Sequence, residues 1–368
     1  MAEHTGQSRA KKAKGIRLMD GERVYVGVDV HSRSYSVAVW SSGRGQVVAH
    51  WTQPASAEKL VDRLTPVKDQ VVQVVYEAGP LGYGLVRALR AAGIRADVIA
   101  TAKMLRTVCL DSKSDRMDCW RLAEHAAKHL LRAIYVPTEQ EERDRQIVRL
   151  REQMVRRCRL TRQQIKSFLL HYGIPKPAGL KNWTDESLQV LRDMPLPAEL
   201  RYCLDVLLDE QAHAHEQVKR VTLAVKVLEA SPRHRTQAKI LQSVPGVGVI
   251  TAMTFRTELL GAERFDHGGE VARIVGLAPR VQESGDRRRE GKLIKAGNKR
   301  LRTILVEAAW RWIDRDPLAQ RHYRRLVANT ADARKAIVGV ARKLAILLWR
   351  MVTREEKYRY AESPPRAA

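Results

Sequence analysis

Four acidic residues occupy positions from which they could hold a metal ion. Asp29 ends one strand-like apolar run, and Glu77 ends another that is rich in β-branched residues. Asp115 and Asp118 are three residues apart, so on a helix both point to one side. Carboxylate oxygens favour Mg²⁺ or Mn²⁺, and two such ions stabilise the attacking and leaving oxygens of a phosphodiester. The acids together predict a magnesium-dependent phosphoryl-transfer site, although each one alone could be a turn former, a surface acid or a helix cap.

A second candidate site lies in a basic segment further along the chain. Ser284 is its only hydroxyl, and a Ser-Gly pair is by composition more often a turn than a nucleophile. Glycines interrupt the basic run, which is typical of a phosphate-gripping loop before a helix. We therefore expect nucleic-acid contacts from this segment, namely from Arg287, Arg288, Arg289, Lys292, Lys295, Asn298, Lys299, Arg300 and Arg302.

The turn around Gly246 and Gly248 is a third candidate. Residues 241–252 have the pattern of a helix, a tight Gly-x-Gly turn and a second helix, the signature of a helix-hairpin-helix. Turn glycines let backbone amides approach a phosphate, and the second helix directs its dipole at the same group. The alternative is an ordinary helix-helix turn with a glycine cap. Neither arrangement would read base sequence, because amide-phosphate contacts only position the nucleic acid.

Composition indicates a polyanionic partner. The 368 residues carry a formal net charge of +25, with 66 Lys and Arg against 41 Asp and Glu. Nucleic acid is favoured over a membrane surface because no run reaches the ~18 apolar residues of a spanning helix. The four cysteines lack ligand spacing, so we expect reduced thiols and no structural zinc. A cytoplasmic protein, associated with the nucleoid when active, is expected.

The elements that must position these residues fall into three bodies between two tails. Residues 1–23 form a basic stretch expected to be a disordered arm. Residues 24–136 alternate strand-like and helix-like runs and predict a mixed α/β sheet. Residues 137–235 predict two long amphipathic helices in a coiled-coil hairpin. We rank its contact with another subunit ahead of packing on itself or on nucleic acid through its arginines. Residues 236–352 predict a small helical domain, and residues 353–368 a tail.

These motifs, taken in order, resemble the DEDD transposases of the insertion-sequence 110 kind, including its 1111 subgroup. The resemblance rests on Asp29, Glu77, the Lys-x-Asp-x-x-Asp of 113–118, the Pro-Gly-Val-Gly turn, and the Gly-Leu-Ala-Pro, Ser-Gly and Gly-Asn-Lys-Arg-Leu-Arg motifs. It implies a RuvC-like (ribonuclease-H-like) domain whose metal-binding tetrad is Asp29, Glu77, Asp115 and Asp118. It also implies a C-terminal transposase domain in which Ser284 attacks DNA and forms a phosphoserine link.

The resemblance further implies partners that composition does not show. These are donor and target DNA, a structured noncoding bridge RNA, and a dimer or tetramer in which Ser284 meets the tetrad of another subunit. Base pairing by the RNA would supply sequence specificity. Two alternatives remain open: a RuvC-type endonuclease such as a Holliday-junction resolvase, which uses metal-activated water, and a non-catalytic nucleic-acid scaffold.

Overall fold

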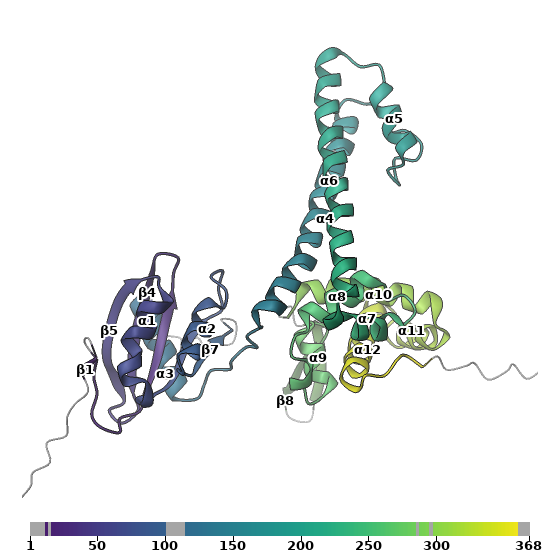
Figure 1. The fold of residues 1–368 in the computed structure, drawn as a ribbon. Helices are drawn as coiled ribbons and strands as arrows, with labels where there is room; N and C mark the ends of the chain where they lie inside the picture. Colours follow the sequence, from purple (N-terminus) through teal and green to yellow (C-terminus); the bar gives the residue numbers. More distant parts are fainter. Residues whose placement is uncertain (1–11, 14–15, 101–114, 285–286, 294–296, 360–368) are drawn as a thin grey trace, which may run out of the picture. The chain divides into compact units, whose positions relative to one another are not determined.

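The chain folds into two compact units, Met1–Pro137 and Thr138–Ala368. The computed structural model describes residues 12–13, 16–100, 115–284, 287–293 and 297–359 (Figure 1). We treat each unit by itself.

A five-stranded mixed sheet with the order β5-β4-β3-β6-β7 forms the centre of the N-terminal unit (Figure 1). Strands β3 (Val24–Val30), β4 (Ser34–Ser41) and β5 (Gln46–Pro54) form an antiparallel meander. Strand β6 (Val71–Glu77) lies parallel to β3, and β7 (Ala96–Ile99) lies parallel to β6. The predicted hairpin and mixed sheet are confirmed.

Helices cover both faces of this sheet because its strands are apolar on both sides. Helix α1 (Ala57–Leu64), the 3-10 helix η1 (Thr65–Gln70) and helix α2 (Gly84–Ala91) share one core with Val24, Val26 and Val28 of β3. Alternate residues of a strand point to opposite faces. Tyr25 therefore packs on the other side, in a cluster with Leu122 of helix α3 (Asp115–Ala127).

The expectation of a disordered arm over residues 1–23 is wrong at its C-terminal end. Strands β1 (Lys12–Ala13) and β2 (Ile16–Arg17) pair with each other. The side chains of Ile16 and Leu18 are 0% and 3% exposed and belong to the core of the sheet. We predicted disorder from the many basic residues and overlooked these two apolar side chains, which pack into the core of the N-terminal unit.

Two 33-residue helices, α4 (Glu139–His171) and α6 (Ala198–Ala230), form the predicted long hairpin (Figure 1). Thr138 and Glu141 begin α4 with a reciprocal capping box. The two helices run antiparallel. Val148 of α4 packs with Val225 and Leu228 of α6 at the base, and residues near 165 pack with residues near 204 further along. No helix in the described part of the chain is long and apolar enough to cross a membrane.

A further helix, α5 (Asp185–Asp193), lies between α4 and α6, where we predicted no helix. Thr184 caps its first turn by accepting a hydrogen bond from the Ser187 amide. Its Leu191 is fully buried with residues of both long helices, in the cluster Ile165, Leu169, Leu180, Leu191, Leu204 and Leu208. The hairpin therefore buries part of its apolar stripe within its own subunit, at the far end.

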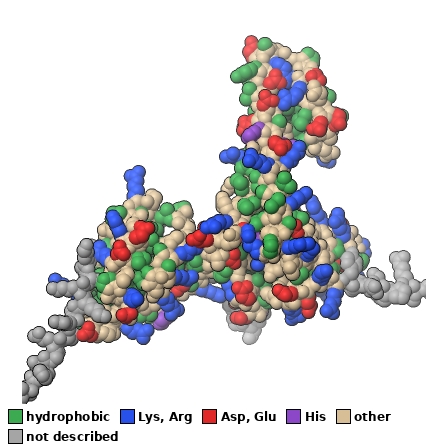
Figure 2. Space-filling model, in the orientation of Figure 1, with side chains coloured by type: hydrophobic (Ala, Val, Ile, Leu, Met, Phe, Trp, Pro, Cys, Tyr) green, Lys and Arg blue, Asp and Glu red, His purple; other side chains and the backbone are tan. Residues whose placement is uncertain are grey.

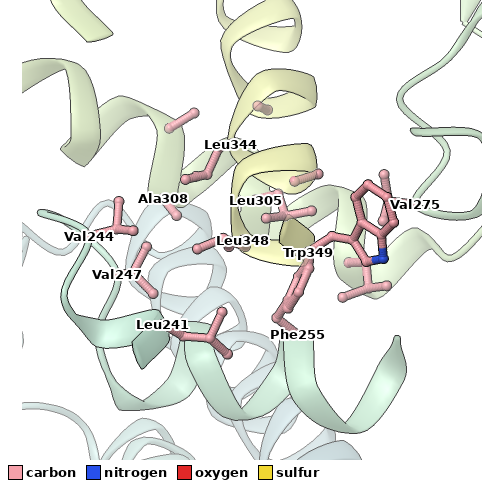
Figure 3. Close-up of a cluster of buried hydrophobic side chains, with 14 of the residues drawn as sticks. Leu241, Val244, Val247, Phe255, Val275, Leu305, Ala308, Leu344, Leu348 and Trp349 are labelled. Carbon is pink, nitrogen blue, oxygen red and sulfur yellow. The ribbon is translucent and has the colours of Figure 1, made fainter. Parts of the chain in front are cut away.

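The rest of the C-terminal unit is a helical body around one large core (Figure 3). Phe255, Leu305 and Leu348 meet in it from three helices, and the Trp349 indole donates a hydrogen bond to the Ala262 carbonyl at 2.8 Å. Its helical elements are α7 (Pro232–Gln242), α8 (Val249–Glu258), the 3-10 helix η3 (Ala262–Arg264), α9 (Gly268–Ile274), α10 (Lys299–Arg315), α11 (Pro317–Thr330) and α12 (Ala333–Arg354).

The basic segment after α9 is a β-hairpin and not the loop that we expected. Strand β8 (Pro279–Ser284) pairs antiparallel with β9 (Arg287–Leu293). Few apolar residues alternate here, so the strand pattern was weak. The two residues between the strands, Gly285-Asp286, are a pair typical of two-residue hairpin turns and are the signal that could have revealed it.

Candidate active site

Asp29 and Glu77 lie at the carboxyl ends of two neighbouring parallel strands. Val28 of β3 is in register with Tyr76 of β6, so Asp29 and Glu77 are the next residues at the same edge of the sheet. Adjacent strands lie about 4.8 Å apart. Both acids also share a face, because Tyr25 and Val75, at alternate positions before them, pack together beneath α3. The structure thus brings these two predicted site residues together.

Gly27 brings helix α3 onto the same face. A Cβ atom at Gly27 would lie 2.1 Å from the Cys119 carbonyl oxygen and 2.6 Å from the Ala123 nitrogen, so only glycine lets α3 lie this close to β3. Asp118 precedes Cys119 directly and therefore lies near the end of β3 that carries Asp29. Helix α3 begins at Asp115, as predicted, but the side chain of Asp115 is outside the part that the structure describes.

The pKa of the Cys119 thiol reflects the negative charges in this region. Burial raises its pKa to about 11, and the negative charges of Asp29 and Asp118 act in the same direction. The thiol is therefore protonated at neutral pH and serves as a buried packing group beside Ala38 of β4. Two of the predicted acids are thus electrostatically close to one buried atom on α3.

His31 is a neighbour of this cluster that the sequence reading overlooked. Its Nε2 lies 3.0 Å from Oδ2 of Asp29, and its backbone amide donates to the Ser34 carbonyl at 3.0 Å, which fixes it at the start of the β3–β4 turn. The signal was its spacing, since residues 29 and 31 face the same side of a strand. An imidazole here orients the Asp29 carboxylate.

The donor set suits a hard divalent cation. Asp29, Glu77 and Asp118 offer carboxylate oxygens, the ligands that Mg²⁺ and Mn²⁺ prefer. Among the described side chains, which do not include that of Asp115, no three His, Cys, Asp or Glu are already placed to hold a metal ion. A role as metal ligands therefore stays a prediction for all four acids.

The predicted nucleophile lies in the C-terminal unit. Ser284 ends β8 and is in register with Arg287, the first residue of β9. Arg288, Arg289 and Lys292 follow on the same strand, whereas Lys295 lies outside the described residues. Ser284 is thus held at the turn end of a hairpin by backbone pairing, next to a strand rich in arginine.

The two turn glycines have different surroundings. Gly246 has φ +89°, and a Cβ atom there would lie 2.9 Å from backbone atoms of Arg311 and Trp312 in α10. Packing against α10 therefore explains Gly246 without any nucleic acid. Gly248 is exposed at the N-cap of α8, with open space beside it. The two helices α7 and α8 and the turn between them lie where we predicted them. Contact of this turn with a phosphate stays a prediction.

Asn298 has a structural role that we did not anticipate. Its side-chain oxygen caps α10 by accepting from the amides of Arg300 and Leu301. Its nitrogen donates to Glu258 at 2.7 Å. Glu258 is also held by both nitrogens of the Arg149 fork, at 2.6 and 2.9 Å. Burial alone would raise the pKa of Glu258, but these hydrogen bonds and the positive charge of Arg149 lower it on balance.

The remaining predicted basic contacts surround the start of α10. Lys299 is exposed in its first turn. Arg300 forms an ion pair with Glu152 of α4 at 2.6 Å, and Arg302 donates to the Gly276 carbonyl at 3.3 Å. Helix α4 thus contributes to this region, which the sequence reading had confined to the segment from 287 to 302.

Comparisons with known proteins agree on one family. Residues 26–174 match a family model described as a transposase of the DEDD, IS110 type, and residues 238–324 match one described as "Transposase IS116/IS110/IS902 family". A protein of Sinorhizobium fredii (strain NBRC 101917 / NGR234), y4qE, described as a transposase, is 30% identical over 328 residues. That match covers 87% of this chain and 80% of y4qE.

A second relative and one solved structure complete the comparison. The transposase for insertion sequence element IS1111A of Coxiella burnetii is 24% identical over 253 residues, which are 67% of this chain and 69% of the relative. The structure "T. thermophilus RuvC in complex with Holliday junction substrate" aligns with 30% of this chain and 99% of the RuvC chain. Its TM-score is 0.23 and its sequence identity 10%.

Proposed function

Since the chain belongs to the IS116/IS110/IS902 family of insertion-sequence transposases and is a DNA transposase, we propose that it cuts and rejoins DNA through a phosphoserine intermediate at Ser284. The proposed metal-binding acids are Asp29, Glu77, Asp115 and Asp118. The observation that carries the proposal is the meeting of Asp29 and Glu77 on one sheet face, beneath the helix that bears Asp118.

The strand order β5-β4-β3-β6-β7 supports a ribonuclease-H-like catalytic domain. In such a site bound Mg²⁺ would neutralise the phosphate and stabilise the oxygens that attack and leave. The residues of this chain supply the rest. Parallel pairing holds Asp29 and Glu77 at one edge, Gly27 lets the helix that bears Asp118 approach the same face, and the His31 imidazole would orient the Asp29 carboxylate.

Ser284 would act as the nucleophile on the same phosphodiester. Its Oγ forms a bond to phosphorus, the bond from phosphorus to the departing DNA oxygen breaks, and the serine proton leaves so that the departing strand ends in a hydroxyl. A hydroxyl of another strand then attacks the phosphoserine and releases Ser284. Bond energy is conserved, so rejoining needs no high-energy cofactor.

A bridge RNA that pairs with donor and target DNA is the proposed source of sequence specificity. The charge of +25 suits binding of two kinds of nucleic acid, and amide and arginine contacts to phosphate do not distinguish bases. We propose a homodimer or tetramer as the active assembly. A short noncoding stretch beside the gene, able to pair with element end and target, would support RNA guidance.

The test of the serine mechanism is a covalent adduct. Wild-type protein with cognate DNA, guide RNA and Mg²⁺ should give a DNA-shifted protein band on denaturing gels, and Ser284→Ala should give none. Ser231→Ala is a control, because Ser231 is a serine of the same unit whose hydroxyl donates to the Leu228 carbonyl at 2.6 Å. Cleavage without an adduct in wild-type protein would instead favour hydrolysis by activated water, as in a RuvC-type endonuclease.

A further inference from the structure

A groove of about 270 Å³ lies where the base of the long hairpin meets the helical body. Helices α4, α8 and α10 form its walls, all within the C-terminal unit. Apolar and charged side chains both line it, and Figure 2 shows Lys and Arg side chains over the surface of the hairpin and the helical body. Val155, Ile250 and Ile304 contribute apolar surface to the groove, the exposed Arg159 and Lys299 lie at its rim, and Arg151 is half-buried.

Cations outnumber acids in this groove. Six Lys and Arg side chains line it against three Glu side chains. Glu152 is shared between Arg300 at 2.6 Å and Arg156 at 3.1 Å, and Glu258 is bound by Arg149. These ion pairs hold the paired arginines in fixed positions. Within the described part of the chain, no carboxylate lies within ion-pair distance of Arg159 or Lys299.

Arg151 is a further cation of this groove that is partly withdrawn from solvent. Its guanidinium is half-buried, and Nε donates to the Thr222 hydroxyl at 2.9 Å. Burial lowers the pKa of Arg151, whereas the negative charge of Glu307 acts in the opposite direction. A buried cation is costly without a partner of opposite charge. An anion entering the groove would provide that partner.

We propose that this groove binds the phosphodiester backbone of one nucleic-acid strand. Arg159 and Lys299 contact phosphates at the rim, Arg151 contacts a phosphate deeper in, and the apolar surface of the groove accepts a sugar or a base edge. The first turn of α10 lines the groove, so the positive end of the helix dipole adds to the attraction. This inference rests on the proposed function in one respect, namely that the partner is a nucleic acid.

The experiment measures binding in excess chelator, so that catalysis does not enter. Fluorescence anisotropy with a 20-nucleotide single-stranded RNA and a DNA of the same sequence is followed at several salt concentrations. Arg159→Ala with Lys299→Ala should weaken binding at least tenfold near 0.1 M salt and lower the salt slope by roughly 1.4 for single strands. The matched control, Lys219→Ala with Lys226→Ala, removes two exposed cations of α6 outside the groove and should change affinity less than threefold.

A substitution that is expected to strengthen binding tests the site further. Glu307→Gln removes an exposed acid from the groove and should tighten binding several-fold, an effect that loss of fold would not produce. Equal losses in the groove pair and the control pair would overturn the proposal, as would an unchanged affinity. A stronger effect on one of the two probes identifies which nucleic acid occupies the groove. If wild-type protein gives no Ser284 adduct while the groove variants still lose binding, the serine mechanism is wrong and the proposal of nucleic-acid binding in the groove is retained.

Discussion

At the scale of single residues, Asp29 is the group on which the proposed chemistry most depends. Asp29→Asn keeps the size of the side chain and removes its charge, so strand cleavage should fall by roughly 10²–10³-fold or more. The melting temperature should change little, because Asp29 is only partly buried. Asp62→Asn is a matched control on the exposed side of α1 and should keep full activity. Normal cleavage by Asp29→Asn would remove the acidic cluster from the mechanism.

His31 tests whether the Asp29 carboxylate must be oriented. Its Nε2 lies 3.0 Å from Oδ2 of Asp29, and removal of such a partner typically weakens metal binding about 10–100-fold. His31→Ala should therefore shift the Mn²⁺ titration measured by thermal stabilisation to higher concentration, in the absence of DNA. His31→Gln retains a side-chain donor and should recover part of the affinity. A titration that does not move would leave His31 as an ordinary turn residue.

At the scale of elements, the contact between β3 and α3 brings the helix that bears Asp118 onto the sheet face that carries Asp29. Gly27→Ala would place a Cβ atom 2.1 Å from the Cys119 oxygen, and the obstacle is helix backbone that cannot rotate away. We expect a loss of about 1–3 kcal/mol in the free energy of unfolding, together with loss of cleavage. Gly43→Ala is the matched control, since nothing lies within 4 Å of a Cβ atom there. Chemical denaturation of both variants measures the difference, and equal stability would show that α3 does not need the contact.

A buried ionic cluster joins α4 to α7 at the base of the hairpin. Asp144 is 3% exposed and is bound by Arg233, by His234 at 2.8 Å and by Gln140. Burial would raise its pKa, but these hydrogen bonds lower it to about 2. A carboxyl group whose pKa is lowered by folding stabilises the folded state at pH values above its pKa in the unfolded chain, which is near 4. That stabilisation is lost as the pH falls towards 2, the pKa in the folded state. The contribution is about 2 kcal/mol.

Asp144→Asn should therefore be less stable than wild type at neutral pH, by roughly 3 kcal/mol, because Arg233 loses its charge partner and a hydrogen-bonded buried carboxylate is removed. The difference in the free energy of unfolding should shrink between pH 4 and pH 2, as urea titrations at each pH would show. A difference that stays constant over this range would mean that Asp144 contributes by packing and not by charge.

The sequence predicted strands, long helices and strand-end acids because each depends on local periodicity. It did not predict Gly27 as a contact point, because that role arises only when β3 and α3 meet from distant parts of the chain. Helix α5 was missed because it is only 9 residues long, and the β8–β9 hairpin was missed because few apolar residues alternate in it. The groove lined by arginines of α4 could not be predicted, because it forms only where α8 and α10 come to lie beside α4 from distant parts of the chain.

At the scale of the whole molecule, the candidate chemical groups are divided between two units, each with its own core. Asp29, Glu77 and Asp118 belong to the first unit, and Ser284 belongs to the second. Such a division allows the serine of one subunit to act with the acids of another. Family resemblance implies that arrangement, and mixing two inactive variants can test it.

Asp29→Asn retains an intact serine, and Ser284→Ala retains intact acids. If each active site takes its serine and its acids from different subunits, a mixed assembly contains one complete site. Equal amounts of the two proteins, unfolded and refolded together, should then recover strand cleavage, at roughly a quarter of the wild-type rate for random pairing into symmetric dimers. Each variant refolded alone should stay inactive. If each site takes both groups from one subunit, no mixture can cleave, so an inactive mixture whose mixed dimers are verified by differential tags would reject the shared site.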